Sequence, residues 1–115
     1  LGTNDTKPQN WKHGADYLDD YKSMISIFSN LTSKPKIYIC LPVPVVESRW
    51  GITDDIVNEK IIPTLRKISN QTKCKIIDLN TPFNNKHNLI PDKVHPNAKG
   101  ATIIAKEVAK SILNS

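Results

Sequence analysis

Two short apolar runs, separated by segments with helical periodicity, restrict the fold of this chain more than any other feature. The runs lie at residues 37–41 and 76–79, and Pro42 and Pro44 follow the first of them. Nearly continuous apolar character is typical of strands that are buried on both faces of a parallel sheet, and proline ends a strand because it cannot donate to the ladder. The segment that begins with Leu1 is interpreted as the end of a third strand that runs into a polar loop.

Three segments with apolar residues at three- and four-residue spacing are predicted to be amphipathic helices. They cover about residues 15–31, 53–68 and 97–113. Pro63 lies inside the second segment and is expected to kink or restart that helix, because its ring removes a backbone donor. The alternating order predicts an α/β fold, with a parallel sheet, right-handed crossovers and helices on both faces.

The polar residues of interest follow the expected strands. In open parallel sheets, ligands bind at the edge formed by the carboxyl ends of the strands. The segments that reach this edge are Gly2-Thr3-Asn4-Asp5, residues 41–50 and residues 80–95. We therefore expect these three segments to converge and to form any site that the chain carries.

The most specific pattern is Asp92-Lys93-Val94-His95-Pro96-Asn97, in which a carboxylate precedes a histidine by three residues at the start of a helix. A serine hydrolase needs a base for the hydroxyl proton and a carboxylate that orients this base. Asn4, after the first strand end, has an amide that can donate to a developing oxyanion. Taken alone, the first pattern is better explained by a surface pair and the second by an ordinary turn.

Together, Gly-x-Asn-Asp and Asp-x-x-His-Pro resemble the third and fifth sequence blocks of the SGNH/GDSL-type serine hydrolases. The resemblance covers essentially the whole chain. It implies a flavodoxin-like three-layer α/β/α fold with a Ser-His-Asp triad. Residues 1–115 would be the C-terminal portion of a single domain of this kind. By motif position it implies His95 as the general base, Asp92 as its orienting partner and Asn4 as an oxyanion donor in a loop shaped by Gly2.

The nucleophile of that family lies in its first block, Gly-Asp-Ser, and this block is not in the sequence. We expect the catalytic serine in a missing N-terminal segment of the same protein, and we expect the chain alone to be inactive. Ser48 follows a strand and could approach His95, but no strand–turn–helix elbow surrounds it.

The resemblance implies ester hydrolysis through a serine acyl-enzyme. A further similarity to bacterial carbohydrate O-acetylesterases indicates an O-acylated sugar as the small-molecule substrate. Trp50 and Trp11 are candidate substrate-binding residues, although capping of a hydrophobic edge explains them equally well. Lysophospholipase or thioesterase activity is the alternative within the family, and a non-catalytic flavodoxin-like binding module is the alternative outside it.

Composition and spacing argue against several other classes. The lysines that give the net charge of +5 are scattered, without an arginine cluster, so no nucleic-acid partner is expected. No apolar run reaches the length of a membrane span. The resemblance implies no metal or organic cofactor, and the irregular spacing of His13, His87, Asp92 and His95 also argues against a metal site. If the protein is a bacterial carbohydrate esterase, we expect it to be periplasmic or secreted; if it is an esterase of another kind, we expect it to be cytoplasmic.

The two cysteines, Cys40 and Cys74, are expected to be free thiols. Cys40 lies near the carboxyl end of one expected strand and Cys74 at the amino end of the other. In parallel neighbours this stagger separates the two residues by on the order of 10 Å. A disulfide needs Cα atoms within about 7 Å.

Overall fold

Two parallel strands lie at the centre of the structure, a computed structural model that describes residues 1–115. Strand β1 (Tyr38–Leu41) pairs with β2 (Lys75–Asp78), with Tyr38 opposite Lys75 and Leu41 opposite Asp78. This confirms the predicted α/β class and the parallel pairing. The predicted strand end at Leu1 is wrong for this chain, because the sheet has only two strands. Leu1, Gly2 and Thr3 lead directly into a 3₁₀ turn (Asn4–Thr6), and none of them pairs with β1 or β2.

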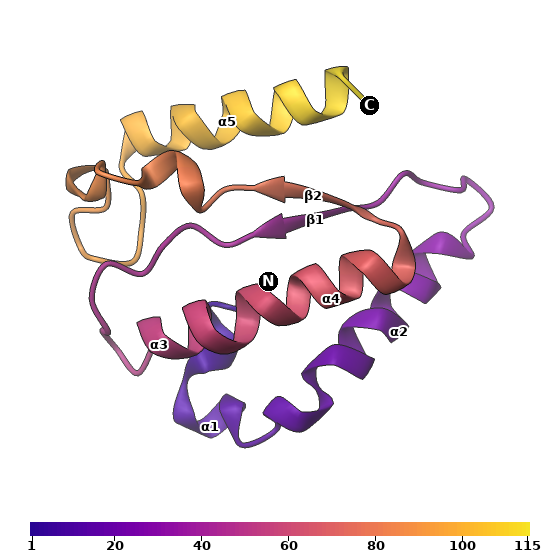
Figure 1. The fold of residues 1–115 in the computed structure, drawn as a ribbon, viewed down its shortest axis with the longest axis horizontal. Coiled ribbons are helices and arrows are strands. Elements are labelled where there is room, and N and C mark those ends of the chain that lie inside the picture. The colour runs from indigo at the N-terminus through magenta and orange to yellow at the C-terminus, as the bar shows by residue number, and fades with distance from the viewer.

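Helices lie on both sides of this sheet, as the alternating pattern predicted (Figure 1). Helix α5 (Ala98–Leu113) contacts β2 from one side, whereas α4 (Ile62–Thr72) contacts both strands from the other. Helix α2 (Tyr17–Ser29) packs against α4 and forms the outer layer on that side. A short helix that the sequence pattern did not indicate, α1 (Pro8–Trp11), begins with a proline, which suits the first turn of a helix.

The second predicted helix is a composite with a π-helical turn. It consists of α3 (Asp54–Ile56), a π-helical segment (Val57–Ile61) and α4. Pro63 lacks the N–H that would bond to the carbonyl of residue 59 in an α-helix, and its ring would clash with that carbonyl. The wider π turn accommodates both effects, so the chain restarts its α-helix without changing direction.

The main core lies between the sheet and the helices α2 and α4. Ile39 and Leu41 point to this face of β1, and Leu41 is fully buried. They pack on a cluster of buried residues from the two helices and the π turn, Ile25, Ile61, Leu65 and Ile68. Because strand residues alternate between the two faces, Cys40 and its neighbour Ile77 face the side of α5.

A smaller second core lies beneath the loops at the carboxyl edge of the sheet. It consists of Val45, Ile52, Val57 and Val94. Three of the four residues come from the loops that follow β1 and β2, and the fourth comes from the π turn. This cluster therefore joins the two loops to each other and to the helix below them.

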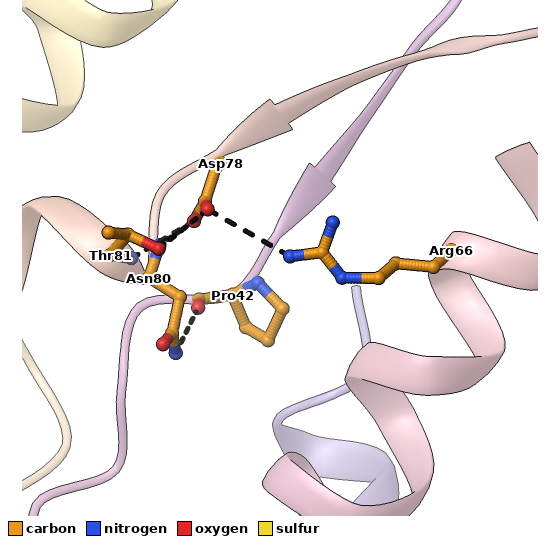
Figure 2. Close-up of polar contacts among 5 residues, drawn as sticks. All are labelled: Pro42, Arg66, Asp78, Asn80 and Thr81. Atoms are coloured by element: carbon orange, nitrogen blue, oxygen red, sulfur yellow. Dashed lines mark hydrogen bonds and ion pairs between the residues drawn. The ribbon is translucent and has the colours of Figure 1, made fainter.

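Asp78 fixes the ends of the two strands (Figure 2). Its carboxylate accepts hydrogen bonds from the Thr81 hydroxyl at 2.7 Å and from the backbone N–H groups of Asn80 and Thr81 at 2.8 and 3.0 Å. The Arg66 guanidinium approaches it from α4 at 4.0 Å, and the Asn80 amide donates to the Pro42 carbonyl at 3.1 Å. Burial alone would raise the pKa of Asp78, but these donors outweigh it and lower the pKa. Asp78 thus has a structural task.

The outer edge of β1 has no strand partner. An apolar groove of about 430 Å³ runs between this edge and α2, and all of its lining residues are hydrophobic. Leu1 and Cys40 both line it. Cys40 and Cys74 are free thiols, three residues out of register, since Cys40 lies opposite Ile77. None of the helices is both long and apolar enough to span a membrane.

Candidate active site

Asp92 and His95 form a closed turn at the carboxyl edge of the sheet. Oδ1 of Asp92 accepts the backbone N–H groups of Val94 at 2.9 Å and His95 at 2.6 Å. The second oxygen, Oδ2, lies 2.7 Å from Nδ1 of the His95 ring. Lys93 adopts a left-handed backbone conformation, φ 75°, which bends the turn enough for one carboxylate to reach all three groups.

The charge of this pair suits a base and its orienting partner. Backbone N–H donation, first from His95 and then from Val94, lowers the pKa of Asp92 to about 2, so the carboxylate is ionised at neutral pH. An ionised carboxylate at Nδ1 favours the tautomer with the proton on that nitrogen and leaves Nε2 free as an acceptor. The His95 side chain is 69% exposed, and Nε2 makes no hydrogen bond within the chain. The ring can therefore take a proton from a group outside it.

The residues around the pair fix its position relative to α5. Val94 is buried in the second core between the two polar residues. Asn97 caps α5, and its side chain accepts the N–H of Gly100 at 3.0 Å. The backbone of the motif is thus held by a buried valine on one side and a helix cap on the other.

The loop after β1, residues 42–53, is bound directly to the motif that carries His95. The N–H of Val46 donates to the Lys93 carbonyl at 2.8 Å, and Nη1 of Arg49 donates to the Asp92 carbonyl at 3.1 Å. The Trp50 ring lies 5.9 Å from the His95 ring, centroid to centroid, with a tilt of 41°. Trp50, a predicted substrate-binding residue, is therefore next to the candidate base, and 56% of it is exposed.

The same loop also binds the segment that contains Asn4. The hydroxyl of Thr6, which is fully buried, accepts the N–H of Thr53 at 2.9 Å and donates to the Thr3 carbonyl at 2.8 Å. Gly2 has a φ of 127°, and a Cβ built on it would lie 2.6 Å from a methyl carbon of Ile61. A side chain at Gly2 would therefore displace this segment.

Asn4 lies on the surface of its turn with an unused amide. The residue is exposed, and only its backbone carbonyl is bonded, by the Asn10 side chain at 2.9 Å and the Lys7 N–H at 3.3 Å. No hydrogen bond joins Asn4 to Asp92 or His95. The loop between Val45 and Thr53 connects the two segments instead, because it is bonded to both.

The other predicted residues have local packing or bonding partners. Trp11 packs against the main core and lies 6.2 Å from the Tyr17 ring, centroid to centroid. The Ser48 hydroxyl donates to the Asp54 carboxylate at 2.5 Å and accepts the Asp54 N–H at 3.2 Å. Ser48 is thus engaged at the start of α3 and not with His95. No three His, Cys, Asp or Glu side chains gather where they could hold a metal ion.

Two residues at this edge, Arg49 and Thr6, have contacts that the sequence reasoning missed. Arg49 bonds to the Asp92 carbonyl and lies over the Trp50 ring, with 4.6 Å between its Cζ and the ring centroid. Thr6 provides the buried link to Thr53. A partial signal for Arg49 was its position next to an aromatic residue and Gly51 in a strand-end loop. Thr6 had none, because an isolated threonine is unremarkable in a loop.

Comparison with known proteins connects this arrangement to one family. The family model described as GDSL-like lipase/acylhydrolase matches residues 1–108. The chain is 32% identical to a protein of Xylanibacter ruminicola named acetylxylan esterase, over 130 aligned positions that cover 97% of the chain and 27% of that protein. The chain therefore spans about a quarter of the length of this curated relative. No solved structure matches the chain.

Proposed function

The chain belongs to the GDSL-like lipase/acylhydrolase family, and from this premise we propose that it supplies the base and the oxyanion loop of a serine esterase. The observation that carries the proposal is the contact of 2.7 Å between Oδ2 of Asp92 and Nδ1 of His95, which leaves Nε2 exposed. An oriented imidazole with one free nitrogen is the arrangement that a hydroxyl nucleophile requires.

The proposed reaction follows acyl transfer through a serine. The serine oxygen attacks the ester carbonyl carbon, its proton passes to Nε2 of His95, and the carbonyl oxygen becomes an oxyanion. The Asn4 amide donates a hydrogen bond to this oxyanion. The tetrahedral intermediate then expels the alcohol, which takes the proton from His95, and the acyl group remains on the serine. A water molecule then attacks the acyl carbon and gives its proton to Nε2 of His95. The second tetrahedral intermediate expels the serine oxygen, which takes that proton back, and the acid is released.

The nucleophilic serine of this proposal lies outside residues 1–115, in an N-terminal part of the same domain. Ser48 is held by Asp54, and this engagement supports a nucleophile elsewhere. The unpaired edge of β1 and the apolar groove beside it also fit a domain in which further chain covers this side. On this proposal, the chain by itself has no esterase activity.

For the substrate, we propose an O-acetylated carbohydrate. The relative from Xylanibacter ruminicola is named an acetylxylan esterase. Trp50 lies beside His95 with more than half of its surface exposed, and an exposed aromatic face suits a sugar ring. Acetylated xylo-oligosaccharides should therefore be turned over faster than lysophospholipids or long-chain acyl thioesters.

The test is the turnover of acetylated xylo-oligosaccharides by the complete protein. His95→Ala should lower kcat by roughly 10⁴-fold or more, because proton transfer is lost. The matched control is His87→Ala, which removes an exposed histidine from the same loop region and should leave kcat unchanged. Circular dichroism establishes that both variants are folded. Near-normal turnover by folded His95→Ala would overturn the proposal and favour a binding module.

A further inference from the structure

The loop after β1 contains a tight turn with an unusual residue at its tip. Arg49 and Ile52 exchange two backbone hydrogen bonds, of 3.1 and 2.9 Å, across the turn. The two residues between them both have left-handed backbones, Trp50 with φ 54° and Gly51 with φ 81°. Glycine adopts this conformation readily, whereas a bulky side chain rarely does. The conformation of Trp50 therefore needs compensating contacts.

Those contacts are made with the candidate base and with Arg49. The Trp50 ring lies 5.9 Å from the His95 ring, within the range of favourable aromatic pairs. The Arg49 guanidinium lies over the Trp50 ring at 4.6 Å from its centroid, which is close enough for a cation–π contact. Nη1 of the same guanidinium donates to the Asp92 carbonyl at 3.1 Å. Arg49 thus joins the tryptophan to the backbone of the residue that orients the base.

His95 has reason to need this second support. The His95 side chain is 69% exposed, and its ring makes one hydrogen bond within the chain, at Nδ1. A single hydrogen bond does not prevent an exposed ring from rotating. A ring packed on the imidazole removes part of this freedom. Small misplacements of a catalytic group are costly, since about 1 Å can lower the rate by about 100-fold.

We infer that Arg49 is a positioning residue for His95, which it supports through the Trp50 ring and through the Asp92 carbonyl. This inference rests on the proposed function, in which His95 is the base. Trp50 is the surface against which the imidazole lies, and Arg49 holds that surface in place. Arginine suits the task because its planar guanidinium can stack on a ring and donate a hydrogen bond at the same time.

The experiment measures kcat and KM of the complete protein on 4-nitrophenyl acetate, a substrate without a sugar that could contact Trp50. Arg49→Gln should lower kcat by about 10- to 100-fold and leave KM within about 2-fold, because the base is misplaced in the transition state. Arg49→Lys should not restore kcat, since an ammonium keeps the charge but cannot stack as a plane. Trp50→Phe should keep most of the rate, and Trp50→Ala should lose about as much as Arg49→Gln.

Two further measurements make the test specific. Arg66→Gln removes the other arginine of the chain, which is exposed and paired with Asp78, and should leave kcat unchanged. In NMR spectra, the ring protons of His95 should lose their ring-current shift in Trp50→Ala, and part of it in Arg49→Gln. Thermal unfolding and circular dichroism confirm that each variant is folded.

The outcomes separate this inference from the proposed function. If His95→Ala is inactive while Arg49→Gln has wild-type kcat, the positioning role is wrong and the proposed function stands. If Arg49→Gln raises KM with kcat unchanged, Arg49 binds substrate and the inference is overturned. If His95→Ala retains turnover, the proposed function fails whatever Arg49 does.

Discussion

Asp92 holds His95 at two points, with Oδ1 2.6 Å from the backbone nitrogen of His95 and Oδ2 2.7 Å from its ring nitrogen Nδ1. The backbone bond fixes the turn and the ring bond ties Nδ1 to the same carboxylate, so one side chain links the backbone and the ring of His95. The ionised carboxylate suits this arrangement best, because it accepts at both oxygens and carries no proton of its own.

The first prediction concerns the pH dependence of stability. The pKa of Asp92 is lowered from 3.8 to about 2 in the folded state, chiefly by the backbone N–H of His95. A lowered carboxyl pKa stabilises the folded state above the unfolded value of 3.8, and this stabilisation is lost as the pH falls through about 2. The difference in unfolding free energy between the wild type and Asp92→Asn should therefore shrink between about pH 4 and pH 2.

Urea titrations at a series of pH values measure this difference. Because the Asp92 side chain is partly exposed to solvent, the effect should be small and best seen at low ionic strength. A difference that stays constant down to pH 2 would show that the carboxylate has no preferential interaction in the folded state. Because Asp92 is ionised above about pH 4, a loss of activity at a higher pH must come from a group other than Asp92.

The second prediction concerns Asn4. Its amide makes no hydrogen bond within the chain, so Asn4→Ala should leave the fold intact and remove one donor to the oxyanion. In the complete protein, kcat should fall by roughly 100- to 1,000-fold. Asn70→Ala, an exposed asparagine on α4, is the control and should have no effect. An Asn4→Ala variant with normal kcat would exclude Asn4 from the oxyanion site.

The third prediction concerns the buried link between Thr6 and Thr53. Thr6→Val keeps the shape of the side chain but removes the hydroxyl that accepts the Thr53 N–H. Leaving this N–H without a partner should lower the free energy of unfolding by about 1–3 kcal/mol. Thr6→Ser keeps the hydroxyl and should recover much of the loss. Equal losses for valine and serine in urea unfolding would indicate that methyl packing, and not the hydrogen bond, is what matters at Thr6.

The layout of the sheet was predictable because its cause is local. The run 37–41 is apolar throughout and the run 76–79 is interrupted only by Asp78, since both faces of the sheet are covered. The contact between Asp92 and His95 was equally predictable, because three residues in a turn bring a carboxylate to a ring nitrogen. In both cases the residues that decide the structure are close in sequence.

What escaped prediction depends on distant partners. Arg49 contacts a residue 43 positions away, and Thr6 contacts one 47 positions away. Neither contact has a periodicity or a motif, because each depends on how two loops meet over the second core. Pro63 predicted a break in its helix, but it could not predict the π turn, which depends on the burial of Val57 and Ile61 in different cores.

That π turn affects how this part of the chain would respond to the deletion of one residue. A π turn closes its hydrogen bond over five residues where an α turn uses four, and Ile62 indeed donates to the Val57 carbonyl. The chain thus stores one surplus residue at this place. Deleting an exposed position such as Asn58 would remove this surplus, and Val57 could then bond to Ile62 in an ordinary α turn without leaving the second core. The cost would fall on Pro63, because its ring would again meet the Glu59 carbonyl that the wider π turn keeps away.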